Sequence, residues 1–342
     1  RDGDIHIHDL DFLTLTTTCC QINLSELFRT GFSTGHGHLR SPRSINSYAA
    51  LACIAIQSNQ NDQHGGQAVP NFDRDMAPGV ALTCADRMRA NMAQSAGVLG
   101  ADQERQDEVT QLAATWPLEA DDATQHAERE KLAEAWPELS AEQVARVHHE
   151  VRTRSVAETE RATYQAMEAF IANLNTMNSR AGAQTPFSSI NYGTDTSPEA
   201  RLVMRCLLEA TRAGLGNGET AIFPIQIFRV MEGVNYHPGD PNHDLFQLAC
   251  RTSAERLFPN FSFQDAPFNA EYHRPGHPET EIAYMGCRTR VMSNVHDTSR
   301  AQTWGRGNLS FTSINLPRLG IQADHDVDRF MSDFDATLSL IH

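Results

Sequence analysis

The sequence is almost devoid of lysine: Lys131 is the only one, and arginine supplies every other basic side chain. Asp and Glu outnumber Lys and Arg by 43 to 28, which gives a formal net charge of −15 at pH 7. Proteins that bind nucleic acid or membrane surfaces in a general way present a basic face to the phosphates. We therefore expect neither nucleic acid nor a membrane among the partners of this chain.

The chain also lacks the cysteine spacings of disulfide frameworks and zinc ribbons. Its seven cysteines are odd in number, and no two of them have C-x-x-C spacing, so we expect no metal site within these residues. No window of about 18 apolar residues suggests a transmembrane helix, and no signal-peptide pattern is recognised. These absences predict a protein of the reducing cytoplasm.

A starting methionine is missing as well. The chain opens directly into a strand-like motif over 4–9 and stops within a helical pattern at Ile341. We interpret the sequence as an internal segment of a longer polypeptide.

What is present is a pattern of apolar strands alternating with helices. Ser44 is a favourable N-cap for a helix over 44–62. Further helices are predicted over 78–95, 200–214 and 243–258, and strands over 14–24, 184–193, 220–230 and 260–265. Such alternation is typical of an α/β sheet covered on both faces. The glycines of 214–218 lead into a strand rather than a helix, so no Rossmann unit is predicted.

Residues 100–155 differ in composition from the rest of the chain. Acidic residues, Gln, Ala and Arg dominate there, and Trp116-Pro117 and Trp136-Pro137 stand twenty residues apart. Two copies are too few for a solenoid. We interpret 100–155 as solvent-exposed helices of uncertain role, inserted into or lying outside the main body, with helix resuming from Ala157 to Met177.

Cys287 is the first candidate for chemistry. It stands beside Gly286, ahead of a polar loop over 293–307 and a predicted buried strand over 309–316. Glycine lets the backbone bend without a side chain in the way, so a neighbouring thiol can approach a substrate closely. A buried structural thiol is the alternative.

Cys19 and Cys20 are adjacent within a strand-like run. Neighbouring strand residues point to opposite faces, so only one of the two thiols can face a given cavity. That thiol and Cys287 could cycle between dithiol and disulfide or share a radical, which requires proximity. The alternative is that both cysteines are small β-compatible fillers.

Three polar motifs leave two interpretations each. The histidines of His6-x-His8 and His36-x-His38 could bind a metal, although satisfied strand-end histidines are favoured because a third ligand pattern is absent. The segment 61–67, which contains His64, fits an active-site rim or a helix end. Gly305-Arg306-Gly307-Asn308 could present backbone N–H groups and an arginine to a phosphate, or form an ordinary loop.

Taken together, these motifs resemble the anaerobic (class III) ribonucleoside-triphosphate reductases, a family of glycyl-radical enzymes. The resemblance covers nearly the whole chain and is weakest over 100–155. The blocks that carry it are Gly3 to Asp11, Cys19 to Leu24, Gly31 to Gly37, Asn61 to Gln67, Gln184 to Asn191, Gly286 to Val291 and Gly305 to Arg318.

The resemblance implies that residues 1–342 are part of a ten-stranded α/β barrel, incomplete in this chain, with a finger loop through its centre. Cys287 falls on the radical cysteine at the tip of that loop. In the family, a stored glycyl radical oxidises this cysteine to a thiyl radical, which abstracts the ribose 3′-hydrogen before the 2′-hydroxyl leaves as water. A second cysteine on the first barrel strand supplies reducing equivalents; Cys19 is preferred for this role and Cys20 remains open.

The resemblance also implies partners and cofactors. The substrates would be ribonucleoside triphosphates, the effectors ATP and dNTPs, and the reductant formate or a thioredoxin-like protein. An iron–sulfur, S-adenosylmethionine-dependent activating enzyme would generate the glycyl radical, and the enzyme would be a homodimer. The glycyl-radical residue and a four-cysteine structural zinc site belong to a C-terminal part that we expect to lie outside this chain, and an ATP-binding domain is expected upstream.

Small polar residues within apolar strands are candidates to hydrogen-bond the ribose or the phosphates. We predict substrate contacts for Ser188, Ser189, Asn191, Ser313, Asn315, Arg306 and His64. The alternatives are a formate-acyltransferase-like glycyl-radical enzyme and a silent fragment that dimerises as a scaffold. Acyltransferases of that type carry paired cysteines on the finger loop, whereas Cys287 stands alone.

Overall fold

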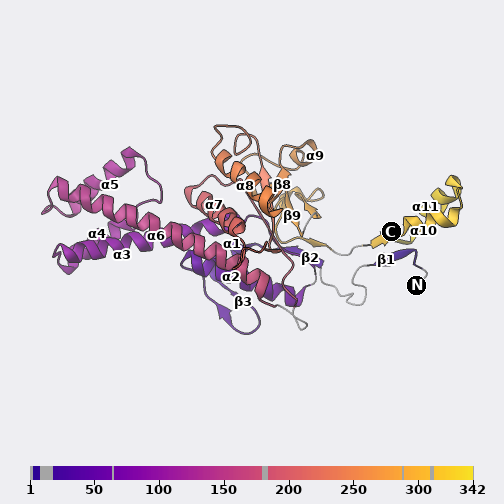
Figure 1. Ribbon diagram of the computed structural model, residues 1–342, viewed down its shortest axis with the longest axis horizontal. Helices are drawn as coiled ribbons and strands as arrows, with labels where there is room; N and C mark the ends of the chain where they lie inside the picture. The colour runs from indigo at the N-terminus through magenta and orange to yellow at the C-terminus, as the bar shows by residue number, and fades with distance from the viewer. Residues whose placement is uncertain are drawn as a thin grey trace.

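The computed structural model describes residues 3–7, 18–63, 65–178, 184–286, 289–308 and 312–341. Its centre is a six-stranded sheet, seen in Figure 1. The strand order is β11 (Gly307–Asn308), β2 (Thr18–Gln21), β5 (Gln67–Val69), β6 (Ser188–Tyr192), β7 (Ile225–Val230) and β8 (Asn260–Phe263). β2 to β8 run parallel, and β11 pairs antiparallel with β2 at one edge.

The two faces of this sheet have different coverings. Val69, Ile190, Tyr192 and Phe228 point to one side and join the helices in the main hydrophobic core; we call this side the helix face. Helices α2 (Ile45–Asp62), α3 (Phe72–Val98), α6 (Ala141–Thr176), α7 (Pro198–Ala213) and α8 (His243–Arg256) supply that core. The sheet is covered on both faces, as predicted, but in the described residues the second face is covered by a β-hairpin.

That hairpin consists of β9 (Ala283–Met285) and β10 (Thr289–Val291), paired antiparallel. β9 packs against β2, β5 and β6. The side of the sheet that it covers, which carries Ala68, Ser189, Asn191 and Arg229, is called the hairpin face. Successive side chains of a strand point to opposite faces of the sheet, so each strand contacts the helices with one set of side chains and the hairpin with the other.

Helix α2 confirms its prediction. Ser44 is the N-cap, and its side chain and that of Ser47 form a reciprocal capping box. Helix α3 is longer than the predicted 78–95: it begins at Phe72, directly after β5, and contains Pro78 in its interior. Proline favours the first helical turn, which is why the sequence pattern placed the start too late.

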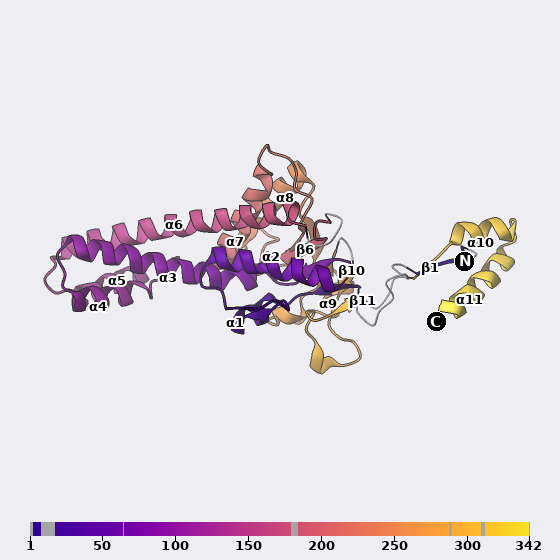
Figure 2. The same ribbon diagram turned by 90° about the horizontal axis from the view of Figure 1, so that it is seen from below.

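The acidic segment forms α4 (Gln103–Ala113), α5 (Asp122–Ala135) and the first half of α6. Figures 1 and 2 show these helices beyond the sheet, beside the distal part of α3. Trp116 and Trp136 are buried and lie just after α4 and α5. The residue before a proline disfavours the helical region, so each Trp-Pro pair ends a helix while its indole joins the core. Helix α6 is continuous from Ala141, and the predicted start at 157 is wrong.

A separate small unit contains both chain ends. Strand β1 (Ile5–Ile7) pairs with β12 (Thr312–Ile314), followed by α10 (Leu316–Ala323) and α11 (Val327–Ile341). Figures 1 and 2 place this unit away from the six-stranded sheet. The prediction of one buried strand over 309–316 is wrong, because Thr312 and Ser313 are exposed and a helix begins at Leu316. Residues 309–311 lie outside the described residues.

The remaining elements are short connections around the sheet. A ten-stranded barrel is not seen in the described part of the chain, whose main sheet has six strands. The connecting elements are α1 (Leu24–Thr30), β3 (Phe32–Ser33), β4 (His38–Leu39), α9 (Pro267–Ala270) and 3₁₀ turns at Pro278–Thr280 and Thr298–Arg300.

Candidate active site

The candidate site lies where the β9–β10 hairpin crosses the hairpin face of the sheet. Cys287 and Arg288 stand between β9 and β10 in the sequence and lie outside the described residues. The residues on both sides of them are described, and they show how the hairpin is held.

Asn191 binds the hairpin through both ends of its amide. Its Nδ2 donates to the Tyr284 carbonyl at 3.0 Å and to the Val69 carbonyl at 3.1 Å. Its Oδ1 accepts the Tyr284 N–H at 2.8 Å. Asn191 is fully buried, so these bonds use all the polar atoms of its side chain without water.

Ser189 holds the hairpin nearer to its tip. The Gly286 N–H donates to Ser189 Oγ at 3.0 Å. Ser188 points to the helix face, where its buried hydroxyl has no hydrogen-bond partner among the residues described. Of the three predicted substrate residues on β6, the structure therefore brings Ser189 and Asn191 to the hairpin and turns Ser188 away from it.

Cys19 lies on the hairpin face. Its Sγ accepts the Gly66 N–H at 3.1 Å, and its side chain packs against the cluster of Ala68, Met285 and Val291. The residue has a φ of 55°, in the left-handed region that non-glycine residues rarely adopt. Strain of this kind persists only where the surroundings enforce it and is concentrated at functional sites.

Cys20 faces the opposite way. Its Sγ accepts from Asn59 Nδ2 of α2 at 2.9 Å and lies 3.3 Å from Gln67 Oε1. Burial raises the pKa of the Cys20 thiol to about 12, so this sulfur stays protonated at neutral pH. The sequence argument that only one of the two thiols can face the site agrees with this arrangement, and the side that each one takes is a finding of the structure.

Two glycines bring Cys19 and the hairpin tip together. A Cβ on Gly65 would lie 2.7 Å from Cys19 Sγ, and a Cβ on Gly66 would lie 3.2 Å from the Gly286 Cα and N. Gly65 also has a φ of 80°. Helix α2 has already ended at Gln63, whose N–H bonds the Asn59 carbonyl. Close backbone approach, rather than helix termination, explains these glycines. His64 lies outside the described residues.

Gln21 was missed by the sequence reasoning. It lies two residues beyond Cys19, on the same face of β2, and is 2% exposed. Among the described residues, neither its Nε2 nor its Oε1 has a hydrogen-bond partner. A buried amide with both atoms unpartnered is rare in folded proteins and indicates a place where a ligand or water would bind. The signal available in the sequence was a large polar side chain beside Cys20 in a short buried strand.

Arg229 and Glu281 form a buried ion pair at the base of the hairpin. Arg229 Nη1 donates to Glu281 Oε2 at 2.9 Å and to Asn71 Oδ1 at 2.8 Å, while its Nε donates to the Ile282 carbonyl at 3.0 Å. Thr194 Oγ1 also donates to Glu281, at 2.6 Å. No pattern in the sequence indicates this pair, because Arg229 stands in an otherwise apolar strand and its partner is 52 residues away.

The other predicted substrate residues lie elsewhere. Arg306 Nη1 donates to the Met292 carbonyl at 3.3 Å, and the Arg306 carbonyl accepts the Gln21 N–H at 2.8 Å, so this residue lines the edge of the sheet beside β2. Ser313 pairs with His6 in the separate β1–β12 unit. Asn315 caps α10 there and donates to the Gly3 carbonyl at 3.1 Å. The structure does not bring Ser313 or Asn315 to the hairpin.

No group of three or more His, Cys, Asp or Glu side chains that could hold a metal occurs among the described residues. His6 lies in the β1–β12 unit and His38 in β4, so the structure keeps these two apart. His8 is outside the described part of the chain. Within that part, no helix is long and apolar enough to cross a bilayer.

One cavity opens at the carboxyl ends of β2 and β5. It has a volume of about 280 Å³, and its lining includes Asn23, Ser25, Arg74, Asp75 and Trp304. Parallel sheets commonly bind ligands at the carboxyl ends of their strands. Burial raises the pKa of Asp75 to about 7, and Arg74 is paired with Glu281 at 3.3 Å.

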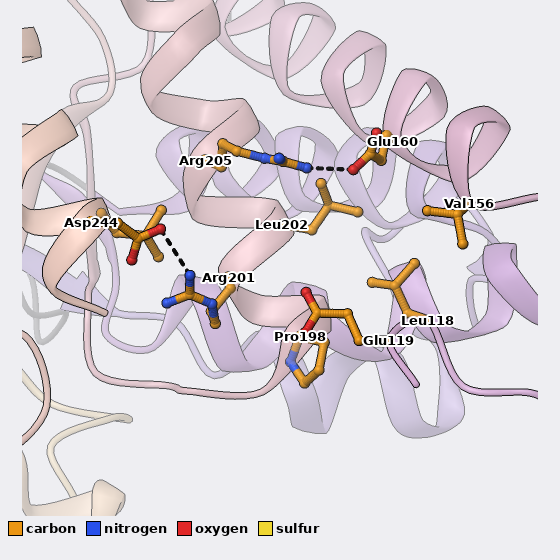
Figure 3. Close-up of a pocket in the computed structure, with 10 residues that line it drawn as sticks. Leu118, Glu119, Val156, Glu160, Pro198, Arg201, Leu202, Arg205 and Asp244 are labelled. Atoms are coloured by element: carbon orange, nitrogen blue, oxygen red, sulfur yellow. Dashed lines mark hydrogen bonds and ion pairs between the residues drawn. The ribbon is translucent and has the colours of Figure 1, made fainter. Parts of the chain in front are cut away.

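A second cavity, of about 170 Å³, lies between α6, α7 and α8 (Figure 3). Arg201 Nη2 donates to Asp244 Oδ2 at 2.9 Å, and Arg205 Nη2 donates to Glu160 Oε1 at 2.6 Å. Each guanidinium that lines this cavity is therefore neutralised by a carboxylate. We assign no ligand to it.

Comparisons with known proteins identify relatives along the whole chain. A family profile described as "Anaerobic ribonucleoside-triphosphate reductase" matches residues 1–342. The anaerobic ribonucleoside-triphosphate reductases of Salmonella typhimurium and Escherichia coli are each 27% identical over 343 residues, which cover 99% of this chain and 40% of theirs. The protein of that name from phage T4 is 28% identical over 326 residues, covering 94% of this chain and 44% of its own. The chain thus spans about two fifths of the length of these relatives.

Solved structures agree on the fold. The anaerobic ribonucleotide reductase from Thermotoga maritima in complex with dATP and CTP superposes with a TM-score of 0.55 at 10% identity, covering 99% of this chain and 46% of that one. The same enzyme with dATP in its specificity site also gives a TM-score of 0.55, at 11% identity. The shared architecture is a mixed α/β fold whose curled sheet forms half of a barrel. The chain belongs to the anaerobic ribonucleoside-triphosphate reductase family.

Proposed function

We propose that this chain carries part of the catalytic centre of an anaerobic ribonucleoside-triphosphate reductase, with Cys287 as the residue that reacts with the ribose and Cys19 as its thiol partner. The observation that supports this most directly is the position of Cys19, whose side chain packs against Met285 and Val291. Cys287 stands between those two residues in the sequence. The family membership supplies the reaction type.

In the proposed reaction a ribonucleoside triphosphate becomes the 2′-deoxyribonucleoside triphosphate. The glycyl radical used by this family supplies the oxidising equivalent. The thiyl radical of Cys287 removes the hydrogen at C3′ of the ribose, and the 2′-hydroxyl takes up a proton and leaves as water. After reduction at C2′, the Cys287 thiol returns the hydrogen to C3′ and is again a thiyl radical. Cys19 supplies reducing equivalents, which formate or a thioredoxin-like protein restores.

The surroundings of Cys19 fit this radical chemistry. Thiyl radicals need a site that excludes water and competing donors. Ala68, Met285 and Val291 are buried apolar side chains, and they cover Cys19 between the sheet and the hairpin. Cys20, by contrast, is held by Asn59 and Gln67 on the helix face, away from the hairpin. We therefore assign the partner role to Cys19.

Gln21 is the residue that we propose as a contact to the substrate ribose or to a small reductant. Ribose hydroxyls both donate and accept hydrogen bonds, and an amide offers the complementary pair of atoms. The unpartnered amide of Gln21 lies on the same strand face as Cys19. Substrate contacts by Ser188, Ser189, Asn191, Arg306, Ser313, Asn315 and His64 remain predictions.

The further properties expected of the whole enzyme are part of the same proposal. They comprise a complete ten-stranded barrel, ATP and dNTP effectors, a homodimer, cytoplasmic location, and activation by an iron–sulfur, S-adenosylmethionine-dependent enzyme. The Thermotoga maritima relative was crystallised with dATP and CTP, which supports nucleotide ligands. The structural zinc expected of the family is assigned to no residue of this chain.

The test uses the full-length protein that contains these residues, activated anaerobically and assayed for conversion of ribonucleoside triphosphates to deoxyribonucleotides. Cys287→Ala should abolish turnover, and Cys19→Ser should do the same while leaving the glycyl-radical signal intact in electron paramagnetic resonance. Cys20→Ser is the matched control, because it changes the adjacent thiol on the other face of the same strand.

Three outcomes would contradict the proposal. Unchanged nucleotide reduction by Cys287→Ala would exclude Cys287 from the chemistry. Loss of activity in Cys20→Ser with full activity in Cys19→Ser would reverse the assignment of the two thiols. An active protein that transfers acyl groups and reduces no nucleotide would favour the formate-acyltransferase-like alternative.

A further inference from the structure

The β9 strand is attached to the sheet by side chains rather than by a backbone ladder. Backbone groups of successive residues point to opposite edges of a strand, so those of Ile282, Tyr284 and Gly286 share one edge. The N–H groups of these three residues are accepted by Gln264 Oε1 at 2.9 Å, Asn191 Oδ1 at 2.8 Å and Ser189 Oγ at 3.0 Å. The three acceptors come from β6 and from the turn after β8.

We propose that Ser189, Asn191 and Gln264 are positioning residues that fix the height and register of the hairpin above the sheet, and with them the place of the residue that follows Gly286. We call these three side chains the amide ladder. The inference rests on the proposed function. It replaces the predicted substrate contacts of Ser189 and Asn191, because it assigns these residues and Gln264 to the placement of Cys287.

Each member of the amide ladder is fully buried and committed to the hairpin. Gln264 Nε2 donates to Ser262 Oγ at 3.1 Å and to the Ile282 carbonyl at 3.3 Å, so its amide holds both backbone groups of Ile282. Asn191 does the same for Tyr284. These side chains therefore have little capacity left to bind a ligand, which separates them from Gln21 with its unpartnered amide.

The base of the hairpin is held by charge. Arg229 and Glu281 are both buried and lie 2.9 Å apart, and Arg229 adds a bond to the Ile282 carbonyl. The hairpin is thus fixed at residue 281 and then at 282, 284 and 286, which are every second residue from Ile282 to the glycine before Cys287. A thiol that must meet both a substrate and Cys19 needs this kind of support, since a displacement of about 1 Å can lower a rate by about 10²-fold.

The experiment uses the full-length, anaerobically activated protein and the variants Ser189→Ala, Asn191→Ala and Gln264→Met. Tyr192→Phe is the matched control. Tyr192 is the next residue along β6, and its hydroxyl donates to Gln226 Oε1 at 2.8 Å on the helix face. The control therefore removes a buried hydrogen bond from the same strand without touching the hairpin.

We expect each ladder variant to lower kcat by about 10²-fold while the KM for the nucleotide changes less than twofold and the glycyl-radical content is unchanged. Hydrogen–deuterium exchange of the 281–286 peptide should be faster than in the parent protein. Tyr192→Phe should leave kcat and that exchange as they are. Ser189→Ala deletes one oxygen, so it keeps the test valid if the larger changes prevent folding.

A raised KM with an unchanged kcat would overturn the inference, because it would make these residues substrate contacts. Unchanged exchange in the 281–286 peptide would overturn it as well, since the hairpin would then be held by other groups. The exchange measurement does not depend on turnover. A parent protein that reduces no nucleotide would refute the proposed function while the exchange data still decide whether the ladder anchors the hairpin.

Discussion

Replacing Gln21 with methionine should make the protein more stable. The Gln21 side chain is 2% exposed, and both polar atoms of its amide lack partners in the part of the chain that the structure describes. Leaving a buried polar group unpaired costs about 1–3 kcal/mol, and methionine has nearly the same shape without that group. Taking the lower part of this range to allow for imperfect packing, we expect Gln21→Met to raise the free energy of unfolding by about 1–2 kcal/mol.

Gln67→Met provides the matched comparison on the neighbouring strand. Gln67 is also fully buried, but its Oε1 accepts from Asn59 Nδ2, and its Nε2 donates to the carbonyls of Gln63 and Gly65, each at 3.3 Å. Removing this amide leaves its partners unsatisfied, so the same substitution should lower the free energy of unfolding by about 1–3 kcal/mol. Urea unfolding of the full-length protein, followed by circular dichroism, measures both changes.

The essential result is that the two substitutions should change the free energy of unfolding in opposite directions. If Gln21→Met destabilised the protein as much as Gln67→Met, the Gln21 amide would have partners in solution and the argument would be refuted. Activity provides a second measurement: Gln21→Met should lower kcat/KM for the nucleotide, since the stabilising change removes the proposed contact. A more stable and fully active variant would show that the amide binds no ligand of the reaction.

Three further predictions concern the glycines, the pH dependence and the helical segment. Gly66→Ala should reduce turnover by at least about tenfold, because the new Cβ would lie 3.2 Å from the Gly286 backbone. Gly216→Ala is the control: its Cβ would meet no described atom within 4 Å, so turnover should not change. Burial raises the pKa of Asp75 to about 7 from an ordinary value near 3.8, so the folded state binds its proton more tightly than the unfolded chain. The stability that this proton contributes is complete below about pH 4 and is lost as the pH rises to about 7, at no more than about 1.4 kcal/mol per pH unit. Asp75→Asn should flatten the pH dependence of thermal unfolding over this range. An unchanged slope would contradict the assignment. Glu128→Ala removes the carboxylate that lies 2.9 Å from the buried guanidinium of Arg152. The substitution should lower the free energy of unfolding by about 3–5 kcal/mol. Hydrogen exchange should become faster in α5 and α6 and stay unchanged in the hairpin.

Local signals in the sequence were sufficient for many of the elements. Ser44 has the side chain and the spacing to Ser47 that a capped helix needs, and α2 begins where predicted. The apolar run that ends at Val230 forms β7. The helices that begin at Phe72 and Ala141 were predicted to begin later in the sequence. Tertiary packing extends both helices through residues whose local preference is for a helix end or a loop.

Only part of the candidate site could be predicted from local signals in the sequence. Strand alternation predicts that Cys19 and Cys20 face opposite sides, but the side with the hairpin depends on the register of Cys20 with Gln67. The contacts between Asn191 and Tyr284, and between Gln264 and Ile282, join residues 93 and 18 positions apart. No periodicity in the sequence encodes such pairs, and a polar residue in an apolar strand is equally consistent with a substrate contact.

The Gly65–Gly66 pair connects these observations. Gly65 allows the Cys19 sulfur to lie against the backbone, and Gly66 both donates its N–H to that sulfur and allows Gly286 to approach from the other side. Neither glycine places a side chain of its own between Cys19 and Gly286. The amide ladder holds the tip from the sheet, the two glycines remove the steric obstacle, and the left-handed backbone of Cys19 directs its thiol to the same place. Under the proposed function, three separate features of the sequence, each ambiguous alone, thus serve one requirement, which is the close approach of a strand thiol to the reactive cysteine.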